Sequence, residues 1–162
     1  MDGIAGFFDY PSEISECDNN GMISGNNGIG GITGLIAPIE EVTNSTVEKC
    51  YNKGTIKGNK NLGGIVGILG GAEGQGTVKE CYNKGEIIGT QHIGEIMGGE
   101  SSPSVLEANP KNTLNKLFYL INERNLTAVG NEQDDDSQGG KKIMGTTEDL
   151  TYEEFKTWIT QQ

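Results

Sequence analysis

Three cysteines, Cys17, Cys50 and Cys81, are the residues of this sequence best suited to redox chemistry or to binding a soft metal. They lie 33 and 31 residues apart, and no two of them form a CxxC pair of the kind found in zinc ribbons. An odd number of cysteines also cannot form a closed set of disulfides. Because a free cysteine behaves as a small buried hydrophobe, we interpret the three as one structural column.

The remaining groups that could do chemistry are isolated in the sequence. The only histidine, His92, lies in a turn with no nucleophile or acid at a catalytic spacing. The run Asp134, Asp135 and Asp136 offers hard oxygen ligands to calcium, but it lacks the alternating pattern of an EF-hand. These three aspartates are the candidate metal ligands, and our interpretation is a solvated acidic loop.

Carboxylates recur along the chain without the arrangement of a glycosidase. That reaction needs two carboxylates about 5 to 10 Å apart, whereas Glu48 and Glu80 occupy recurrent positions beside lysines and predict an outer charged face. Tyr51 and Tyr82 are the candidate ligand contacts, because exposed aromatic rings one repeat apart could stack on sugars. The alternative is an aromatic pair that covers the face of a sheet. We expect no catalytic residue and no cofactor.

Composition excludes several classes of partner. The 162 residues carry a net charge of −11, which argues against nucleic acid and against anionic membranes. We find no apolar run approaching the roughly 20 residues that span a bilayer, so we expect no membrane insertion. The chain has 26 glycines but only 4 prolines, which favours short strands joined by tight turns over a disordered linker.

The positioning elements come from an internal repeat. Three segments align without gaps: ISECDNNGMISGNNGIGGITGLI from Ile14, VEKCYNKGTIKGNKNLGGIVGIL from Val47 and VKECYNKGEIIGTQHIGEIMGGE from Val78. A glycine inside a helix costs about 1 kcal/mol, so recurrent glycines between short Ile and Val runs favour strands. Equivalent residues should then stack about 4.8 Å apart in parallel register.

In the second copy we expect strands at Lys49 to Lys53, Thr55 to Lys57 and Gly64 to Leu69, with turns at Gly54 and around Asn59 to Asn61. Side chains alternate along a strand, so an inward cysteine implies an outward tyrosine and an inward asparagine. The predicted columns are Cys17, Cys50 and Cys81; Asn19, Asn52 and Asn83; Ile23, Ile56 and Ile87; and Ile32, Ile65 and Ile96.

The segments GGITG (Gly30 to Gly34), GGIVG (Gly63 to Gly67) and GEIMG (Gly94 to Gly98), each after a Cys-Tyr-Asn-type strand, resemble GLUG-motif repeats. The resemblance covers residues 3 to 99 and implies a β-helical stalk or binding region of a bacterial surface or secreted protein, without catalytic residues. Glu95 departs from the pattern, because it stands where the other copies have glycine. The chain also begins inside a repeat, at Gly3, so we expect a part of a longer chain.

The last third of the chain should close the stack, since an open end exposes apolar side chains and strand edges. Leu114 to Leu120 aligns as a degenerate fourth copy with Leu117 in place of cysteine, although its apolar spacing also fits a helix. We favour the strand. Thr151 and Glu154 form a capping box that predicts a helix from about Tyr152 to Thr160, with Trp158 packed on the end of the stack.

These patterns predict an all-β fold, a parallel β-solenoid or β-helix of about three to four coils, assumed to be right-handed because parallel crossovers prefer that hand. Residues 1–99 should form GLUG-like coils, and residues 100–162 the last coil and a C-terminal cap with a helix near 152–160. The expected function is a non-catalytic repeat region, a stalk or scaffold or an adhesin-like module that binds a host or matrix protein or glycan, extracellular or at the cell surface. The alternative is a carbohydrate-active β-helix protein, a polysaccharide lyase or glycoside hydrolase.

Overall fold

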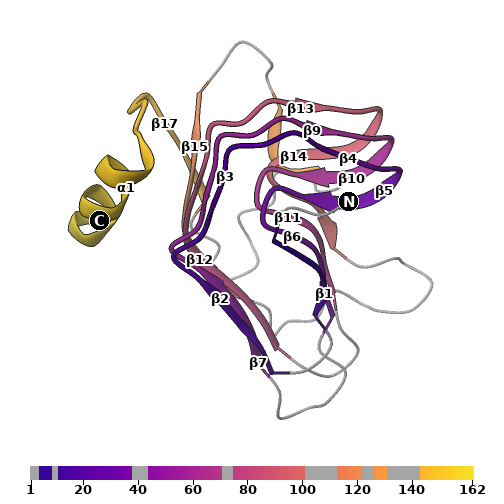
Figure 1. Cartoon of the computed structure of the whole chain (residues 1–162), viewed down its shortest axis with the longest axis horizontal. Coiled ribbons are helices and arrows are strands. Elements are labelled where there is room, and N and C mark those ends of the chain that lie inside the picture. The colour runs from indigo at the N-terminus through magenta and orange to yellow at the C-terminus, as the bar shows by residue number, and fades with distance from the viewer. Residues whose placement is uncertain are drawn as a thin grey trace.

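The structure, a computed structural model, describes residues 4–8, 11–37, 44–70, 75–100, 113–121, 126–130 and 143–162. Within these ranges the chain is mostly β, with parallel sheets and one short α-helix (Figure 1). The all-β class expected from the glycine-rich repeat is therefore confirmed. No helix in these ranges has the length and apolar character needed to cross a membrane.

The strands recur in the same order in each copy of the repeat. The first copy contains β2 (Glu13–Ser15), β3 (Asp18–Asn19), β4 (Ile23–Ser24), β5 (Asn27–Gly30) and β6 (Thr33–Ile36). The second contains β7 (Asn44–Glu48), β8 (Tyr51–Asn52), β9 (Ile56–Lys57), β10 (Lys60–Gly63) and β11 (Val66–Leu69). The third contains β12 (Gln75–Asn83), β13 (Ile87–Ile88) and β14 (Gln91–Glu100), because neighbouring short strands merge there. The other strands are β1 (Ala5–Phe8), β15 (Thr113–Leu120), β16 (Thr127–Val129) and β17 (Ile143–Thr146).

Equivalent residues of consecutive copies pair side by side in parallel. Ile14 pairs with Val47, Val47 with Val78, and Val78 with Leu114. The main strand orders are β1-β6-β11-β14-β10-β5, β17-β15-β12-β7-β2 and β13-β9-β4. Together the sheets curl like a half-barrel around a common interior (Figure 1).

The strand boundaries differ from those that the sequence predicts. The expected strands near Tyr51, Ile56 and Val66 are present as β8, β9 and β11, but β7 and β10 are additional. In particular, the turn predicted around Asn59 to Asn61 is largely strand. Its residues have low β-propensity, so tertiary pairing of β10 with β5 and β14 decides its conformation.

In each copy the residue just before the cysteine position takes a left-handed backbone conformation and sets the orientation of the strands around it; a second left-handed residue recurs later in the copy, at Gly28, Asn61 and His92. Glu16, Lys49, Glu80 and Lys116 have φ values of 53°, 51°, 52° and 50°. Simple alternation would place Val47 and Cys50 on opposite faces of a strand. The left-handed residue between them acts like a bulge, so both side chains reach the same core.

The interior enclosed by the sheets contains two rows of stacked apolar side chains, and a third cluster forms outside it, where the C-terminal helix packs. The larger row includes Ile32, Ile65 and Ile96, all without solvent exposure, together with the cysteines. The smaller row includes Ile23, Ile56 and Ile87, which pair in register as the repeat predicts. Each copy thus contributes a few medium-sized side chains to a narrow interior, which is consistent with the low aromatic content.

The predicted fourth strand is confirmed, and the helical alternative for the same segment is wrong. β15 pairs with β12 from Thr77 and Thr113 onwards, and Leu117 lies opposite Cys81. β17 then pairs with β15 and extends the sheet by a further strand that the sequence does not predict. Pairing with an already formed edge therefore outweighs the 3.6-residue spacing of the leucines.

The helix α1 (Tyr152–Trp158) is confirmed with its capping box, and a 3-10 turn, η1 (Ile159–Gln161), follows it. Its predicted location on the end of the stack is wrong. Figure 1 shows α1 beside the outer face of the sheet that contains β12 and β15. The Trp158 ring packs edge-on against Phe118 of β15, with ring centroids 4.6 Å apart. The outward aromatic residues of the sheet supply the apolar surface that the helix needs.

Candidate functional site

The cysteine column is a packing feature. Cys50 and Cys81 are fully buried, Cys17 is half-buried, and all three are free thiols. Each sulfur donates to the carbonyl two residues earlier, at 3.1 to 3.2 Å. Burial raises the pKa of the Cys17 thiol, and raises the pKa of Cys81 well above its ordinary value, which keeps these thiols protonated and weakly nucleophilic. No cluster of three or more metal-ligating side chains occurs in the part of the chain that the structure describes.

The asparagines form a continuous hydrogen-bonded ladder through the three copies. Asn19 Nδ2 donates to Asn52 Oδ1 at 2.8 Å, and Asn52 Nδ2 donates to Asn83 Oδ1 at 2.8 Å. Each Oδ1 also accepts from the backbone N–H of the glycine two residues later, at 3.0 to 3.1 Å. The asparagine ladder therefore fixes each glycine turn and joins each copy to the next.

Glu95 ends this ladder. Its carboxylate accepts from Asn83 Nδ2 at 3.0 Å, and the residue is only 2 % exposed. In the second copy the equivalent position must be glycine, because a Cβ on Gly64 would lie 2.2 Å from Cγ of Asn83. Above Asn83 the pairing residue is Tyr119, so no further amide competes for that space. The departure from glycine at position 95 was the sequence signal for this role.

Tyr51 and Tyr82, predicted as exposed ligand contacts, are 1 % and 0 % exposed, so that prediction of exposure is wrong. Both rings point out of the interior as alternation requires, but the C-terminal segment covers them. The rings stack with centroids 5.5 Å apart and planes 12° from parallel. Their hydroxyls donate to the carbonyls of Leu150 at 2.7 Å and Glu148 at 2.6 Å. Binding of a sugar to these rings would require displacement of α1.

The spacing of the aromatic residues on α1 matches the spacing of the strands beneath it. Three helical residues rise about 4.5 Å, close to the separation of about 4.8 Å between neighbouring strands. Accordingly Tyr152 lies near Tyr51, Phe155 lies 5.9 Å from both tyrosine rings, and Trp158 contacts Phe118 of β15. The helix thus crosses several copies and contacts each one.

Polar contacts anchor the segment where α1 begins. The Tyr152 hydroxyl donates to the Glu16 carbonyl at 2.6 Å, and Lys84 Nζ donates to Asp149 at 2.6 Å. Burial raises the pKa of Tyr152 to about 12 and also raises the pKa of Tyr82. Both rings are therefore neutral at physiological pH. The sequence gives no signal for these contacts, because the partners are 65 or more residues apart.

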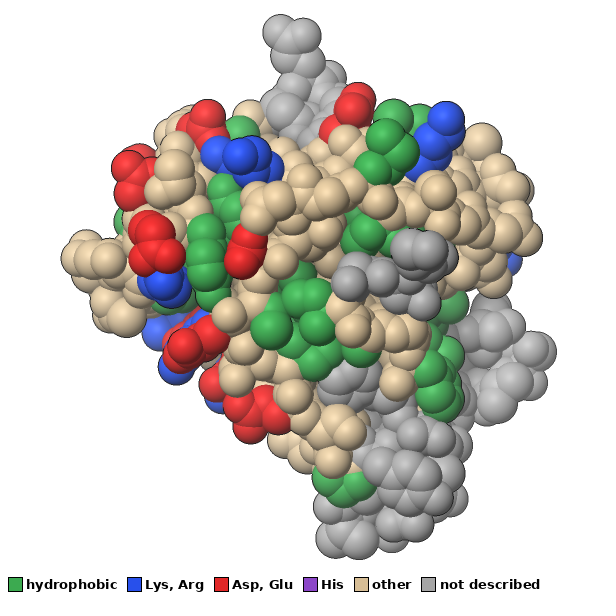
Figure 2. Space-filling model, viewed as in Figure 1, with side chains coloured by type: hydrophobic (Ala, Val, Ile, Leu, Met, Phe, Trp, Pro, Cys, Tyr) green, Lys and Arg blue, Asp and Glu red, His purple; other side chains and the backbone are tan. Residues whose placement is uncertain are grey.

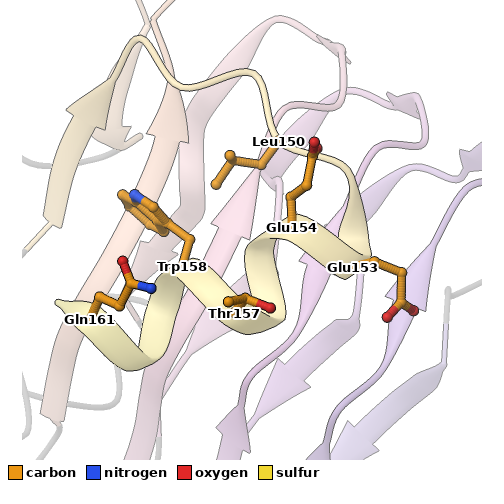
Figure 3. A pocket seen from close by; sticks show the side chains of 6 residues that line it. All are labelled: Leu150, Glu153, Glu154, Thr157, Trp158 and Gln161. Atoms are coloured by element: carbon orange, nitrogen blue, oxygen red, sulfur yellow. The ribbon is translucent and has the colours of Figure 1, made fainter.

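An open hollow of about 480 Å³ lies on α1 (Figure 3). Its lining consists of Leu150, Glu153, Glu154, Thr157, Trp158 and Gln161. Figure 3 shows Glu154 near Leu150 and Glu153 directed away from them. The Glu154 carboxylate accepts from the Thr151 backbone, and the Glu153 carboxylate pairs with Lys156 at 2.7 Å. With its acids engaged in this way, the hollow offers apolar surface and no nucleophile–base pair.

Among the described residues, the remaining sequence candidates do not converge on a site. His92, predicted in a turn, lies in β14; it is exposed, and its Nδ1 lies 3.0 Å from Asn61 Oδ1, which continues a ladder of exposed side chains. Glu48 pairs with Lys79 at 2.6 Å, and acidic and basic side chains alternate along the side of the molecule where α1 lies (Figure 2). Asp134, Asp135 and Asp136 lie outside the described residues.

Comparisons with models of known protein families, with curated proteins and with solved structures find no match to this chain.

Proposed function

We propose that this chain is a non-catalytic, GLUG-type β-solenoid region of a bacterial surface or secreted protein, which acts as a stalk or scaffold. One observation carries the proposal: the residues that recur in the repeat make contacts between copies. The cysteines, the asparagines and two isoleucine rows all lie in the interior, and each contacts its equivalent or lies in one continuous cluster with it. Each turn of the chain, hereafter a coil, thus contributes to stacking.

Side-chain chemistry supports a structural role. Burial raises the pKa of the Cys81 thiol and keeps it protonated, and the carboxylate that ends the asparagine ladder accepts a hydrogen bond from Asn83 inside the core. The histidine is exposed on β14 and contacts an asparagine. A hydrolase or lyase would instead need opposed acid and base groups in a groove.

Duplication of one coil tests the scaffold. A second copy of residues 47–77, inserted after Thr77, places its Val47 in the register position that Val78 now holds. We expect a folded chain about 4.8 Å longer by small-angle scattering and a higher unfolding midpoint, because each coil adds an interface. The matched control carries Ala at Gly64 of the inserted copy, where a Cβ would clash with the amide above it. An insertion that behaves as an unfolded loop, with no gain in midpoint, contradicts the proposal.

The adhesin-like form of the proposal is tested with immobilised glycans and matrix proteins. Saturable binding without release of product supports a binding module on the stalk. Release of oligosaccharides from any polysaccharide in the panel contradicts the non-catalytic assignment and favours a carbohydrate-active enzyme. The net charge of −11 requires these assays to be run at two salt concentrations, because long-range repulsion by anionic ligands is screened by salt.

A further inference from the structure

The first copy differs from the second and third copies in how its strands β2, β3, β4 and β5 are paired, and these strands form one face of the stack. Within the described ranges, each of these strands pairs with a strand on one side, that of the second copy. In Figure 1 these indigo strands lie nearest the viewer, and Figure 2 shows hydrophobic side chains gathered at the centre of the same view. Cys17 and Asn19 are half-buried, whereas their equivalents in the second and third copies are fully buried.

The glycine turns indicate what fits this face. A Cβ on Gly54 would lie 1.9 Å from the carbonyl oxygen of Gly21, and a Cβ on Gly85 would lie 2.1 Å from that of Gly54. Both positions must therefore be glycine because a turn of the same kind lies beneath them. At Gly21 the nearest atom is Asn19 Oδ1, at 3.7 Å, which any small side chain tolerates. If a further turn lay beneath Gly21, the same steric clash would explain why this position is glycine.

Hydrogen bonding points to the same occupant. Asn52 Oδ1 and Asn83 Oδ1 each accept from a turn N–H and from the asparagine of the preceding copy. Asn19 Oδ1 accepts from the Gly21 N–H, and among the described residues no asparagine of a preceding copy donates to it. Meanwhile β1 pairs with β6 in the same register as β6 pairs with β11. β1 therefore occupies the place of the last strand of another coil.

We propose that this face binds one further coil of the same repeat in parallel, with β1 as its last strand, an asparagine under Asn19 and a glycine turn under Gly21. This inference rests on the proposed scaffold function and adds an interaction surface with a specified partner. The first coil is then an internal coil of the stack rather than its end. Antiparallel pairing with a second copy of the chain would not explain the glycine at position 21.

The test supplies such a coil. Residues 44–63, with Ser at the copy of Cys50, are fused directly before Gly3, so that the new segment continues into β1. Gly21→Ala is then made in the original and in the extended chain. We expect a shift of the thermal midpoint below about 2 °C in the original chain and a loss of more than about 5 °C in the extended one. Gly54→Ala is the matched control and should lower the midpoint strongly in both chains.

Alkylation of Cys17 gives an independent reading. The half-buried thiol should react with iodoacetamide in the original chain and become protected in the extended chain, as buried Cys50 and Cys81 are. Equal effects of Gly21→Ala in both chains, with Cys17 unprotected, overturn the inference. Dimerisation of the original chain that protects Cys17 overturns it as well, in favour of a second copy. If the chain with a duplicated coil folds while this extension fails to dock, the result contradicts this inference and leaves the proposed scaffold function standing.

Discussion

Replacement of Asn52 by alanine removes the central rung of the asparagine ladder. The side chain has no exposed surface, and its Nδ2 donates to Asn83 Oδ1 at 2.8 Å and to the Gly54 carbonyl at 3.3 Å. Its Oδ1 accepts from Asn19 Nδ2 at 2.8 Å and from the Gly54 N–H at 3.1 Å. The substitution therefore removes four hydrogen bonds from a site that excludes water.

The expected loss follows from these contacts. At about 1 kcal/mol of net stability for each hydrogen bond, Asn52→Ala should lower the free energy of unfolding by about 4 kcal/mol. Asn19 makes three comparable hydrogen bonds but is half-exposed, so water replaces most of them. We expect Asn19→Ala to cost about 1 kcal/mol. The difference between the two variants isolates the effect of burial on the same side chain in the same repeat position.

Urea unfolding followed by far-UV circular dichroism measures both variants. Lys53→Ala, an exposed neighbour, is the control and should stay within about 0.5 kcal/mol of the unmodified chain. A loss of about 4 kcal/mol is a large fraction of the stability of an ordinary domain, about 5 to 15 kcal/mol, so the effect is measurable. Equal losses in Asn52→Ala and Asn19→Ala would refute the reasoning, because the buried amides would then contribute no more than a solvated one.

Three further outcomes test the other contacts. Glu95→Ala removes the carboxylate that accepts from Asn83 and should cost about 2 kcal/mol in urea unfolding, whereas Glu95→Gln keeps an acceptor and should cost less than about 1 kcal/mol; equal losses contradict the ladder terminus. Phe155→Ala should weaken docking of α1 by about 3 kcal/mol and expose the single tryptophan to fluorescence quenchers while the β signal persists; unchanged quenching contradicts the packing. Burial raises the pKa of Tyr152 to about 12 and also raises the pKa of Tyr82. Below the ordinary tyrosine pKa of 10.0 both rings are neutral whether α1 is docked or detached, so pH has no effect there. As the pH rises from about 10 to 12 the detached rings ionise first, so the free energy of docking α1 should become less favourable. If Tyr82→Phe or Tyr152→Phe removes tyrosinate absorbance that appears at the ordinary pKa with α1 still docked, the ring concerned is not buried.

The sequence alone determines the part of the structure that repeats. Each copy presents the same short pattern to its neighbours, so Cys50 or Ile56 can be placed above its equivalent from spacing alone. The same reasoning assigns Leu117 to the fourth strand, because pairing with an existing edge repeats one interaction already made. The helix cap at Thr151 is also local, since its donors and acceptors lie within three residues.

Only the tertiary structure determines the positions of the segments and residues that do not repeat, such as α1 and Glu95. Alternation predicts that Tyr51 points outward, but only the docking of α1, about 100 residues later, determines that its ring is buried. In the sequence, Glu95 is a departure from the glycine pattern. The structure explains it, because Tyr119 rather than an asparagine pairs with Asn83, and the Glu95 carboxylate accepts the Asn83 hydrogen bond instead. Both outcomes depend on contacts between segments that are distant in sequence and share no pattern. The repeat predicts contacts between a residue and its equivalents in other copies. The contacts of Tyr51 with α1 and of Asn83 with Glu95 involve partners that do not recur, so the repeat cannot predict them.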